Sequence, residues 1–490
     1  MANIQPQNRK TFSFRWLYKA GGYLCLSVVA LIIGFFVLAS YFNASYNPSL
    51  PKVNQRSIVL DHVSIIDVTA ESAGDRIIPN QQIVIEQGQI TAINPAGSPV
   101  NEHYTKLDLT GKYVIPGLFD MHVHIQDPQQ LALALSYGFT SVRDLSGQKR
   151  HLAWKKQLNN KTWLGSNLFV SSPIINGASG HILNQIITTS DQAQQFVQFA
   201  HQQGFDLIKV YGYVNQEVYE TIAKEASRLN MPVAKHAPHP VDNSNWEYLQ
   251  GLQSLEHVED IFQGPLNYEF DFNEAEKVAE RLKQLNVPVT PTLTTFDHLT
   301  QLSLHKHQYV KQHNKKLHNP FYLDLKETHT IARWLDASEA HADYNQRELD
   351  FLKQLVLLLY KNEVPMVLGS DGGTMYTLAG PAGIREIELL AESGLPSFAI
   401  IKMATVNSAV ALGVEEEQGV ITKNTIADLV VLDENPIDYL QTIRSPFAVV
   451  KNGQFLDRSA LKKIQLGAEE TDSWFKTVVQ IIDDWIWRNF

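Results

Sequence analysis

The sequence predicts an α/β protein whose largest part folds as an eight-stranded (β/α)8 TIM-like barrel. Between residues 113 and 414, short β-rich runs alternate with helical stretches, and their number matches that barrel. Further β-rich runs flank this region on both sides, which predicts a small sheet domain built from both chain ends. The expected barrel strands are Val114–Ile125, Phe139–Leu145, Leu168–Ser172, Asp206–Tyr211, Pro232–His236, Ser254–Val258, Val287–Leu293 and Met366–Asp371.

Length and composition exclude several classes of protein. The chain has 490 residues, 44% hydrophobic and 19% charged, so it is long enough for several domains and apolar enough for a large core. Its net charge of −10 at pH 7 argues against a nucleic-acid-binding surface. A single cysteine, Cys25, excludes an internal disulfide and a multi-cysteine zinc site. Any metal must therefore be held by histidine, carboxylate or a modified lysine.

The N-terminal segment predicts a membrane anchor. Gly21–Phe42 is almost wholly apolar, carries no charge and is long enough to cross a bilayer. Lysine and arginine residues precede it, so the positive-inside bias predicts a single-pass protein with a cytoplasmic N-terminus. The catalytic part would then lie on the extracytoplasmic, periplasmic side. A cleaved signal peptide is the alternative, although the apolar run is longer than a usual signal core.

The chain ends in a segment with the pattern of an amphipathic helix. Packing of this helix against the barrel is the leading expectation, and a position in the membrane interface beside the anchor is the alternative. The apolar positions at helical spacing are Trp474, Val478, Ile481, Ile482 and Trp485. The expected organisation is a cytoplasmic N-terminus (1–20), an anchor (21–42), a linker (43–55), a first β part (56–112), the barrel (113–414), a second β part (415–465) and the C-terminal helix (466–490).

Residues able to bind metal stand at the ends of five expected strands. His122 and His124 lie two positions apart, so in a strand they point to the same face. Lys209 lies in an otherwise apolar strand, where a free ammonium is costly to bury. Each residue alone has a structural alternative, such as an ion pair, a core histidine or a turn. The complete set is His122, His124, Lys209, His236, His257 and Asp371.

This set predicts a site for two divalent metal ions. Imidazole and carboxylate groups are common metal ligands, and zinc is the default ion for a histidine-rich site. A lysine cannot coordinate as an ammonium, but a carbamate formed on Lys209 with carbon dioxide offers two anionic oxygens that can bridge two metals. We therefore expect a metal-activated hydroxide to attack a carbonyl carbon, with Asp371 as the catalytic proton shuttle.

Several motifs resemble those of the metal-dependent amidohydrolase superfamily, most closely its imidazolonepropionase and prolidase-like branch. The motifs are FDMHVH, IKVY, KHAP, SLEHV and GSDGG, followed by MATVNSAVALGV, GVITKNTIADLVVLDENP and VVKNG. The resemblance spans residues 56–455 and implies a barrel with a small β-sandwich built from both chain ends. It also implies that the six residues are metal ligands and that a carbamylated Lys209 bridges two metals.

Two residues outside the metal set, His181 and Tyr211, are candidates for substrate contact. His181 lies in the glycine-rich loop NGASGHI, and Tyr211 should face the same side as Lys209 unless it packs inside the barrel. Arg143 is expected to form a structural pair with Asp144 or a neighbour. Residues 296–344 form a long, helix-like insertion and a candidate lid. Its histidines lack ligand spacing and are expected at the surface: His298, His305, His307, His313, His318, His329 and His341.

Together these patterns predict a membrane-anchored enzyme that cleaves an amide-type C–N bond in a small-molecule substrate. By analogy with the family, the leading substrate is a dipeptide or an N-acylated amino acid. One alternative is an esterase, lactonase or cyclic amidase that uses the same site. The other is a non-catalytic, metal-dependent binding module. No nucleic-acid partner is expected, and the oligomeric state is left open.

Overall fold

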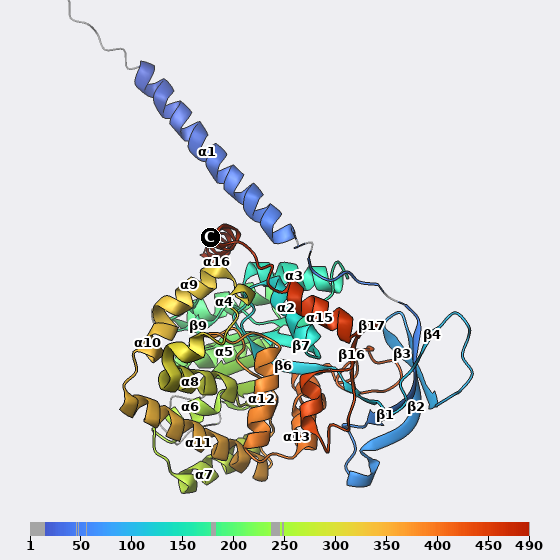
Figure 1. The fold of residues 1–490 in the computed structure, drawn as a ribbon. Helices are drawn as coiled ribbons and strands as arrows, with labels where there is room; N and C mark the ends of the chain where they lie inside the picture. Colours follow the sequence, from blue (N-terminus) through green and yellow to red (C-terminus); the bar gives the residue numbers. More distant parts are fainter. Residues whose placement is uncertain are drawn as a thin grey trace, which may run out of the picture.

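A long helix projects from a body that contains two sheet regions (Figure 1). The structure is a computed structural model that describes residues 15–45, 47, 49–54, 56–177, 183–236, 246 and 249–489. The projecting helix is α1 (Arg15–Ala44). Within the described residues, Gly21–Ala44 is the one helical segment long and apolar enough to cross a membrane, with a mean hydropathy of 2.5.

The larger sheet region consists of parallel strands that surround the centre of the body. One group pairs in the order β6–β7–β8, and the other in the order β10–β9–β11–β12–β13–β14. The strands are β6 (Leu118–Val123), β7 (Phe139–Asp144), β8 (Asn167–Val170), β9 (Ile175–Asn176), β10 (Gln185–Ile186), β11 (Ile208–Val210), β12 (Val233–His236), β13 (Ser254–Glu256) and β14 (Val289–Thr290).

Isolated parallel bridges connect the two groups into a ring. Ser171 pairs with Leu207 between β8 and β11. The extended segment 366–372 lies between β14 and β6, through bridges from Val289 to Met366 and from Val123 to Gly372. This curled parallel sheet is consistent with a TIM-like barrel, in which functional residues gather at the carboxyl ends of the strands.

The first expected barrel strand, Val114–Ile125, is in fact two strands divided at Gly117. β5 (Tyr113–Pro116) pairs with strands of the second sheet, and only β6 belongs to the ring. The Gly117 amide donates to the Asp428 carbonyl at 2.8 Å, and any side chain at this position would overlap Thr140. The chain therefore crosses from one sheet to the other at a residue that cannot carry a side chain.

The second sheet combines strands from both ends of the chain. Its order is β17–β16–β15–β5–β1–β2–β3, and β4 pairs with β1. It packs a separate cluster of buried aliphatic residues that includes Leu60, Ile83, Val114, Leu429 and Val450. The strands are β1 (Ile58–Ile66), β2 (Ile77–Glu86), β3 (Gln89–Pro95), β4 (Thr105–Asp108), β15 (Leu429–Leu432), β16 (Ala448–Lys451) and β17 (Gln454–Asp457).

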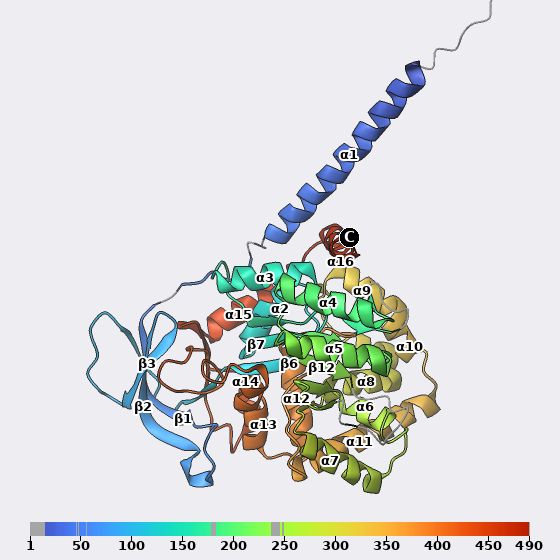
Figure 2. The same cartoon turned by 180° about the vertical axis from the view of Figure 1, so that it is seen from behind.

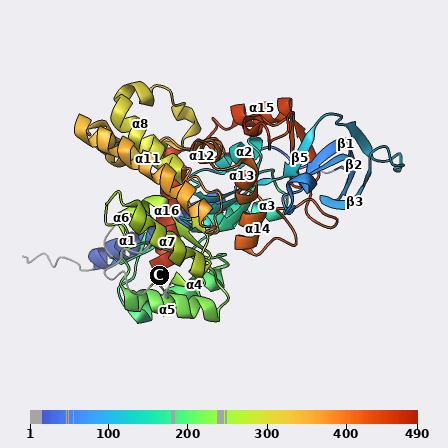
Figure 3. The same ribbon diagram turned by 90° about the horizontal axis from the view of Figure 1, so that it is seen from below.

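Helices surround the barrel sheet, as the views from behind and from below show (Figures 2 and 3). The helices are α2 (Pro128–Ser136), α3 (Lys149–Asn159), α4 (Ser190–Gln203), α5 (Gln216–Arg228), α6 (Val258–Gln263), α7 (Phe272–Leu285), α11 (Glu339–Lys361), α12 (Pro381–Glu392), α13 (Ser397–Met403), α14 (Val406–Leu412) and α15 (Arg458–Gly467).

The insertion at 296–344 is helical, but its histidines are not all at the surface. His318 is buried, and His298 and His313 are half-buried, whereas the other four are exposed. The His313 ring stacks on Tyr376 with centroids 5.0 Å apart. The expectation that all these histidines lie at the surface was wrong for His298, His313 and His318. Aromatic packing joins segments that are distant in sequence, so it cannot be recognised from the spacing of the histidines. The insertion contains most of α8 (Leu293–Val310), then α9 (Pro320–Lys326), a π-helical turn (Glu327–Ile331), α10 (Ala332–Leu335) and the start of α11.

The C-terminal helix α16 (Trp474–Asn489) packs against α1, α3 and α9, largely through polar residues. Asp483 is buried and lies 3.0 Å from the Lys149 ammonium, and buried Asp484 pairs with Arg488 at 2.9 Å. Four large apolar side chains face outward instead: Trp474, Phe475, Ile482 and Trp485. The expected apolar stripe is therefore largely the exposed side of this helix, because charged partners on neighbouring helices satisfy its polar side.

Candidate active site

The six predicted metal-binding residues meet at the carboxyl ends of the barrel strands. The His122 ring lies 5.3 Å from the His124 ring and 4.6 Å from the His257 ring, between centroids. The His236 ring continues the series at 4.5 Å from His257. Lys209 lies in the middle of β11. Burial lowers the pKa of His122 to about 4 and the pKa of His236 well below its usual value, and the charge of Lys209 lowers both further. Five strands thus deliver one contiguous cluster.

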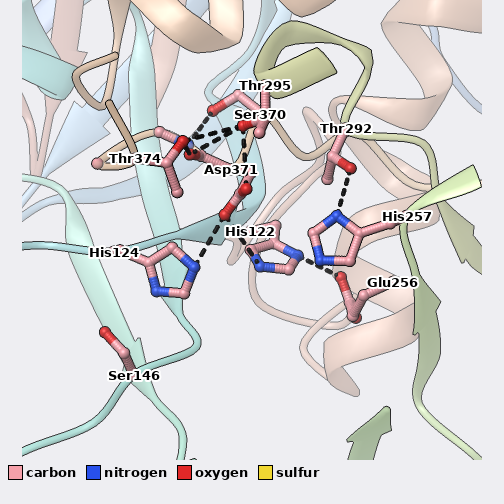
Figure 4. Close-up of polar contacts among 12 residues, drawn as sticks. His122, His124, Ser146, Glu256, His257, Thr292, Thr295, Ser370, Asp371 and Thr374 are labelled. Carbon is pink, nitrogen blue, oxygen red and sulfur yellow. Dashed lines mark hydrogen bonds and ion pairs between the residues drawn. The ribbon is translucent and has the colours of Figure 1, made fainter. Parts of the chain in front are cut away.

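Asp371 faces the first two histidines (Figure 4). Its Oδ1 lies 2.8 Å from His124 Nε2 and 3.4 Å from His122 Nε2, and Thr295 donates a 2.9 Å hydrogen bond to its Oδ2. Burial raises the pKa of Asp371, but the hydrogen bond from His124 and the charges of neighbouring histidines outweigh it and hold this pKa well below the usual range. The carboxylate is therefore ionised at neutral pH, which is the form that binds a metal.

Three of the histidines are oriented through Nδ1, which leaves Nε2 available. His122 Nδ1 lies 2.7 Å from Glu256, and His257 Nδ1 lies 2.6 Å from the Thr292 hydroxyl. His236 Nδ1 lies 2.8 Å from Asp260. Metal-binding histidines are usually held in this way, because the partner fixes both the ring and the tautomer.

Glu256 connects the cluster to the barrel interior. Its carboxylate contacts His122 and also accepts a 2.8 Å hydrogen bond from the Arg143 guanidinium, with all three side chains buried. Burial raises the pKa of Glu256, but Arg143 and His122 together lower it well below its usual value. Arg143 thus forms the expected structural ion pair, although with Glu256 rather than Asp144. Sequence reasoning missed Glu256, whose only signal was a charge inside the apolar run SLEH.

The extended segment 366–372 can approach the histidines closely because Gly369 and Gly373 lie on either side of Asp371. A side chain at Gly369 would overlap His122, and one at Gly373 would overlap the His124 carbonyl. Asp371 itself has φ 54°, in the left-handed region, as do His257 at 69° and Thr292 at 55°. Strained backbone of this kind concentrates at functional sites, where the surrounding structure holds it in place.

The donor set fits a divalent metal. Ligand atoms of His122, His124 and Asp371 lie within 4.8 Å of one another. His122 Nε2 and Lys209 Nζ are buried and make no hydrogen bond to any described residue. Burial lowers the pKa of Lys209 to about 8, which favours the neutral amine that reacts with carbon dioxide. Buried polar atoms without partners are costly, so a group that satisfies them is expected here.

A pocket of about 380 Å³ is lined by His124 and by Gly373 and Thr374, which follow Asp371 in the chain. Tyr211 lines this pocket, as expected, and its ring also lies 4.2 Å from that of His236. His181 lies outside the described residues. A second wall of the pocket comes from the insertion, which the sequence had suggested only as a candidate lid. The lining residues from the insertion are Tyr322, Leu325, Lys326, His329 and Thr330.

Fold and site together define a barrel protein with a candidate metal centre at the carboxyl ends of its strands. A sequence model of the amidohydrolase family matches residues 113–456, and the chain therefore belongs to this family. This membership confirms the resemblance inferred from the motifs and supports a hydrolase that acts on carbon–nitrogen bonds.

Individual relatives are distant. The chain is 36% identical over 69 residues to the imidazolonepropionase of Paracoccus denitrificans (strain Pd 1222), which covers 14% of this chain and 17% of that protein. The curated relatives are thus matched over a minor part of their length. A bottromycin amidohydrolase has a similar fold, with a TM-score of 0.71, 22% identity and coverage of 89% of this chain and 97% of that one. A Xaa-Pro dipeptidase with bound methionine has a TM-score of 0.63, 17% identity and coverage of 82% and 100%.

Proposed function

We propose that the protein is a metal-dependent hydrolase that cleaves an amide-type C–N bond in a small molecule. The observation that carries this proposal is the buried cluster of four histidines, Lys209 and Asp371 at the barrel mouth. In this proposal His122, His124, His236, His257 and Asp371 would hold two divalent ions, and Lys209, as a carbamate, would supply further anionic oxygen ligands. Zinc is the expected metal.

The residues of the chain have separate roles in this proposal. When bound, the two ions supply activation of a water molecule and polarisation of the scissile carbonyl. Asp371 accepts the proton of the attacking water and delivers it to the leaving nitrogen, and Thr295 holds its carboxylate in place. Glu256, Thr292 and Asp260 keep the imidazole rings oriented. Tyr211 and His181 are proposed to contact the substrate.

A dipeptide or an N-acylated amino acid is the proposed substrate class. Solved structures with a similar fold include a Xaa-Pro dipeptidase with bound methionine and a prolidase in complex with N-methylphosphonate-L-proline, and these names support a dipeptide-like substrate. Esters, lactones and cyclic amides remain alternatives because the same centre can act on any activated carbonyl. The binding-module alternative is disfavoured by Asp371, since binding alone needs no ionised proton acceptor.

Metal content tests the proposal directly. We expect about two metals per chain in the detergent-solubilised full-length protein after zinc loading, and a clear loss in Lys209→Met. Lys451→Met is the matched control, because Lys451 is a buried lysine of β16 that pairs with Asp428 at 2.6 Å and lies outside the metal cluster. One metal that is unaffected by Lys209→Met would leave a mononuclear centre, and no metal at all would overturn the hydrolase proposal.

We also propose that α1 anchors the protein in a membrane as a single pass, with the barrel on the extracytoplasmic side. α1 leaves the body beside α16, where Asn43 donates a 2.9 Å hydrogen bond to Asp483 and the rings of Phe42 and Phe475 lie 6.2 Å apart. The exposed Trp474 and Trp485 of α16 would then lie at the membrane interface, where such side chains are favoured. In this view residues 56–112 and 415–465, together with β5, form one β domain beside the barrel, which begins at β6 rather than at residue 113.

Fractionation distinguishes the anchor from a cleaved signal peptide. We expect the full-length mass in a carbonate-washed membrane pellet, and exogenous protease should reach the barrel only from the extracytoplasmic side. A shortened chain released into the soluble fraction would instead show that residues 21–42 are a signal peptide.

A further inference from the structure

Lys326 stands at the end of α9, in the insertion that forms the second wall of the pocket. Its side chain is 9% exposed, and its Nζ is buried without a hydrogen-bond partner among the described residues. The described residues that line this pocket include no other lysine or arginine. The Lys326 side chain therefore borders the same cavity as His124 and Tyr211, while its Nζ is shielded from solvent.

Other buried lysines outside the metal set have an evident structural partner. Lys451 contacts Asp428 at 2.6 Å, Asn167 at 2.7 Å and the Thr140 carbonyl at 3.1 Å. Lys235 donates to the His236 carbonyl. The nearby Arg150 donates to the Tyr322 hydroxyl at 2.6 Å. Lys326 differs from all of these. Burying a cation without a partner is unfavourable, so an anionic ligand that supplied the partner would stabilise the ammonium form of Lys326.

The charges around Lys326 indicate the sign of that ligand. The Asp371 carboxylate is close enough to favour the protonated form of Lys326, although burial is the larger effect and lowers the pKa of Lys326 to about 7. An anionic group that enters the pocket would be repelled by Asp371, and the Lys326 ammonium is the described cation placed to offset this repulsion.

We propose that Lys326 binds the carboxylate of the substrate and so restricts the enzyme to substrates with a free carboxyl end. This inference rests on the proposed amide hydrolysis and adds the group that the second wall recognises. An ammonium paired with a carboxylate inside a pocket gives a charge-assisted hydrogen bond, which is stronger than a neutral one. The assignment also gives the insertion a role, because α9 presents Lys326 to the strand ends that carry the metal cluster.

The test compares N-acetyl-L-methionine with its C-terminal primary amide, which lacks only the charge. Binding of each compound to the zinc-loaded full-length protein is measured by calorimetry, and hydrolysis is followed separately. We expect the wild type to bind the acid about 10- to 100-fold more tightly than the amide. Lys326→Met should abolish this preference by weakening binding of the acid alone, and Lys326→Arg should retain part of it.

Lys315→Met is the matched control, since Lys315 lies in the same insertion but is exposed and pairs with Glu327 at 2.5 Å. Its acid preference should equal that of the wild type. The inference is overturned if the wild type shows no preference for the acid, or if Lys326→Met weakens acid and amide equally. Turnover answers a different question: binding that follows the expected pattern without any hydrolysis would refute the proposed function and leave the carboxylate site standing.

Discussion

The two walls of the pocket are built in different ways. The strand-end wall carries His124, Tyr211 and the cluster behind them, and every imidazole in that cluster is held by a carboxylate or a hydroxyl. The insertion wall carries Tyr322, Lys326 and His329 on helical segments, and the Lys326 ammonium has no partner among the described residues. We infer that the first wall is arranged for chemistry and the second for substrate selection.

The largest expected effect is on the strand-end wall, with Asp371→Asn. An amide cannot take the proton of the attacking water, so kcat should fall by about 10²- to 10⁴-fold. Metal content should fall much less, because His122 and His124 remain in place. Stopped assays with an N-acyl amino acid, alongside metal analysis of the same samples, measure both quantities.

Thr374→Val is the control for Asp371→Asn. The Thr374 hydroxyl lies 3.0 Å from that of Thr295, close to Asp371, but it has no part in the proposed proton transfer. The substitution should change kcat by less than about 10-fold, since it removes only neutral hydrogen bonds, among them those with the Thr295 hydroxyl and the Asp371 carbonyl. If metal content in Asp371→Asn instead falls in step with turnover, Asp371 is chiefly a ligand, and proton transfer belongs to another group.

The contrast between the walls also explains what the sequence could predict. The positions of His122, His236, His257 and Asp371 follow from local pattern, because strand ends in an α/β barrel meet at one face. The strands themselves were recognisable because short runs rich in β-branched and aromatic residues are a local feature of the sequence. Even so, the run through Gly117 serves two sheets, since the local pattern does not distinguish one long strand from two short ones.

The second wall depends on contacts between distant segments, which leave little trace in sequence. Lys326 sits in an ordinary amphipathic stretch, where a lysine is usually solvated, and only the fold places it beside the pocket. His313 and His298 are half-buried for a similar reason. On α16 the spacing identified a stripe correctly but not its environment, because Lys149 and Asn43 supply partners for the polar side.

A smaller effect is expected from Glu256→Gln, which tests whether the strand-end wall depends on its supporting carboxylates. Glutamine keeps the shape but not the charge, so His122 loses its orienting anion and Arg143 loses its buried counter-ion. Metal affinity should fall by about 10- to 100-fold, as measured by competition with a chelator. The free energy of unfolding should fall by about 3–5 kcal/mol, because a buried cation is left unpaired.

Glu259→Gln is the matched control for Glu256→Gln, three residues along the chain. Burial raises the pKa of Glu259 to about 8, so this carboxyl is largely uncharged at pH 7 and the substitution removes little charge. Metal affinity should stay within about 3-fold of the wild type, because Glu259 orients none of the four imidazoles. Equal losses in both variants would mean that the cluster responds to general disturbance near α6 and β13 rather than to the anion on His122. A loss of metal affinity confined to Glu256→Gln would establish that the metal centre depends on the buried Glu256 carboxylate, which holds the His122 ring in its orientation.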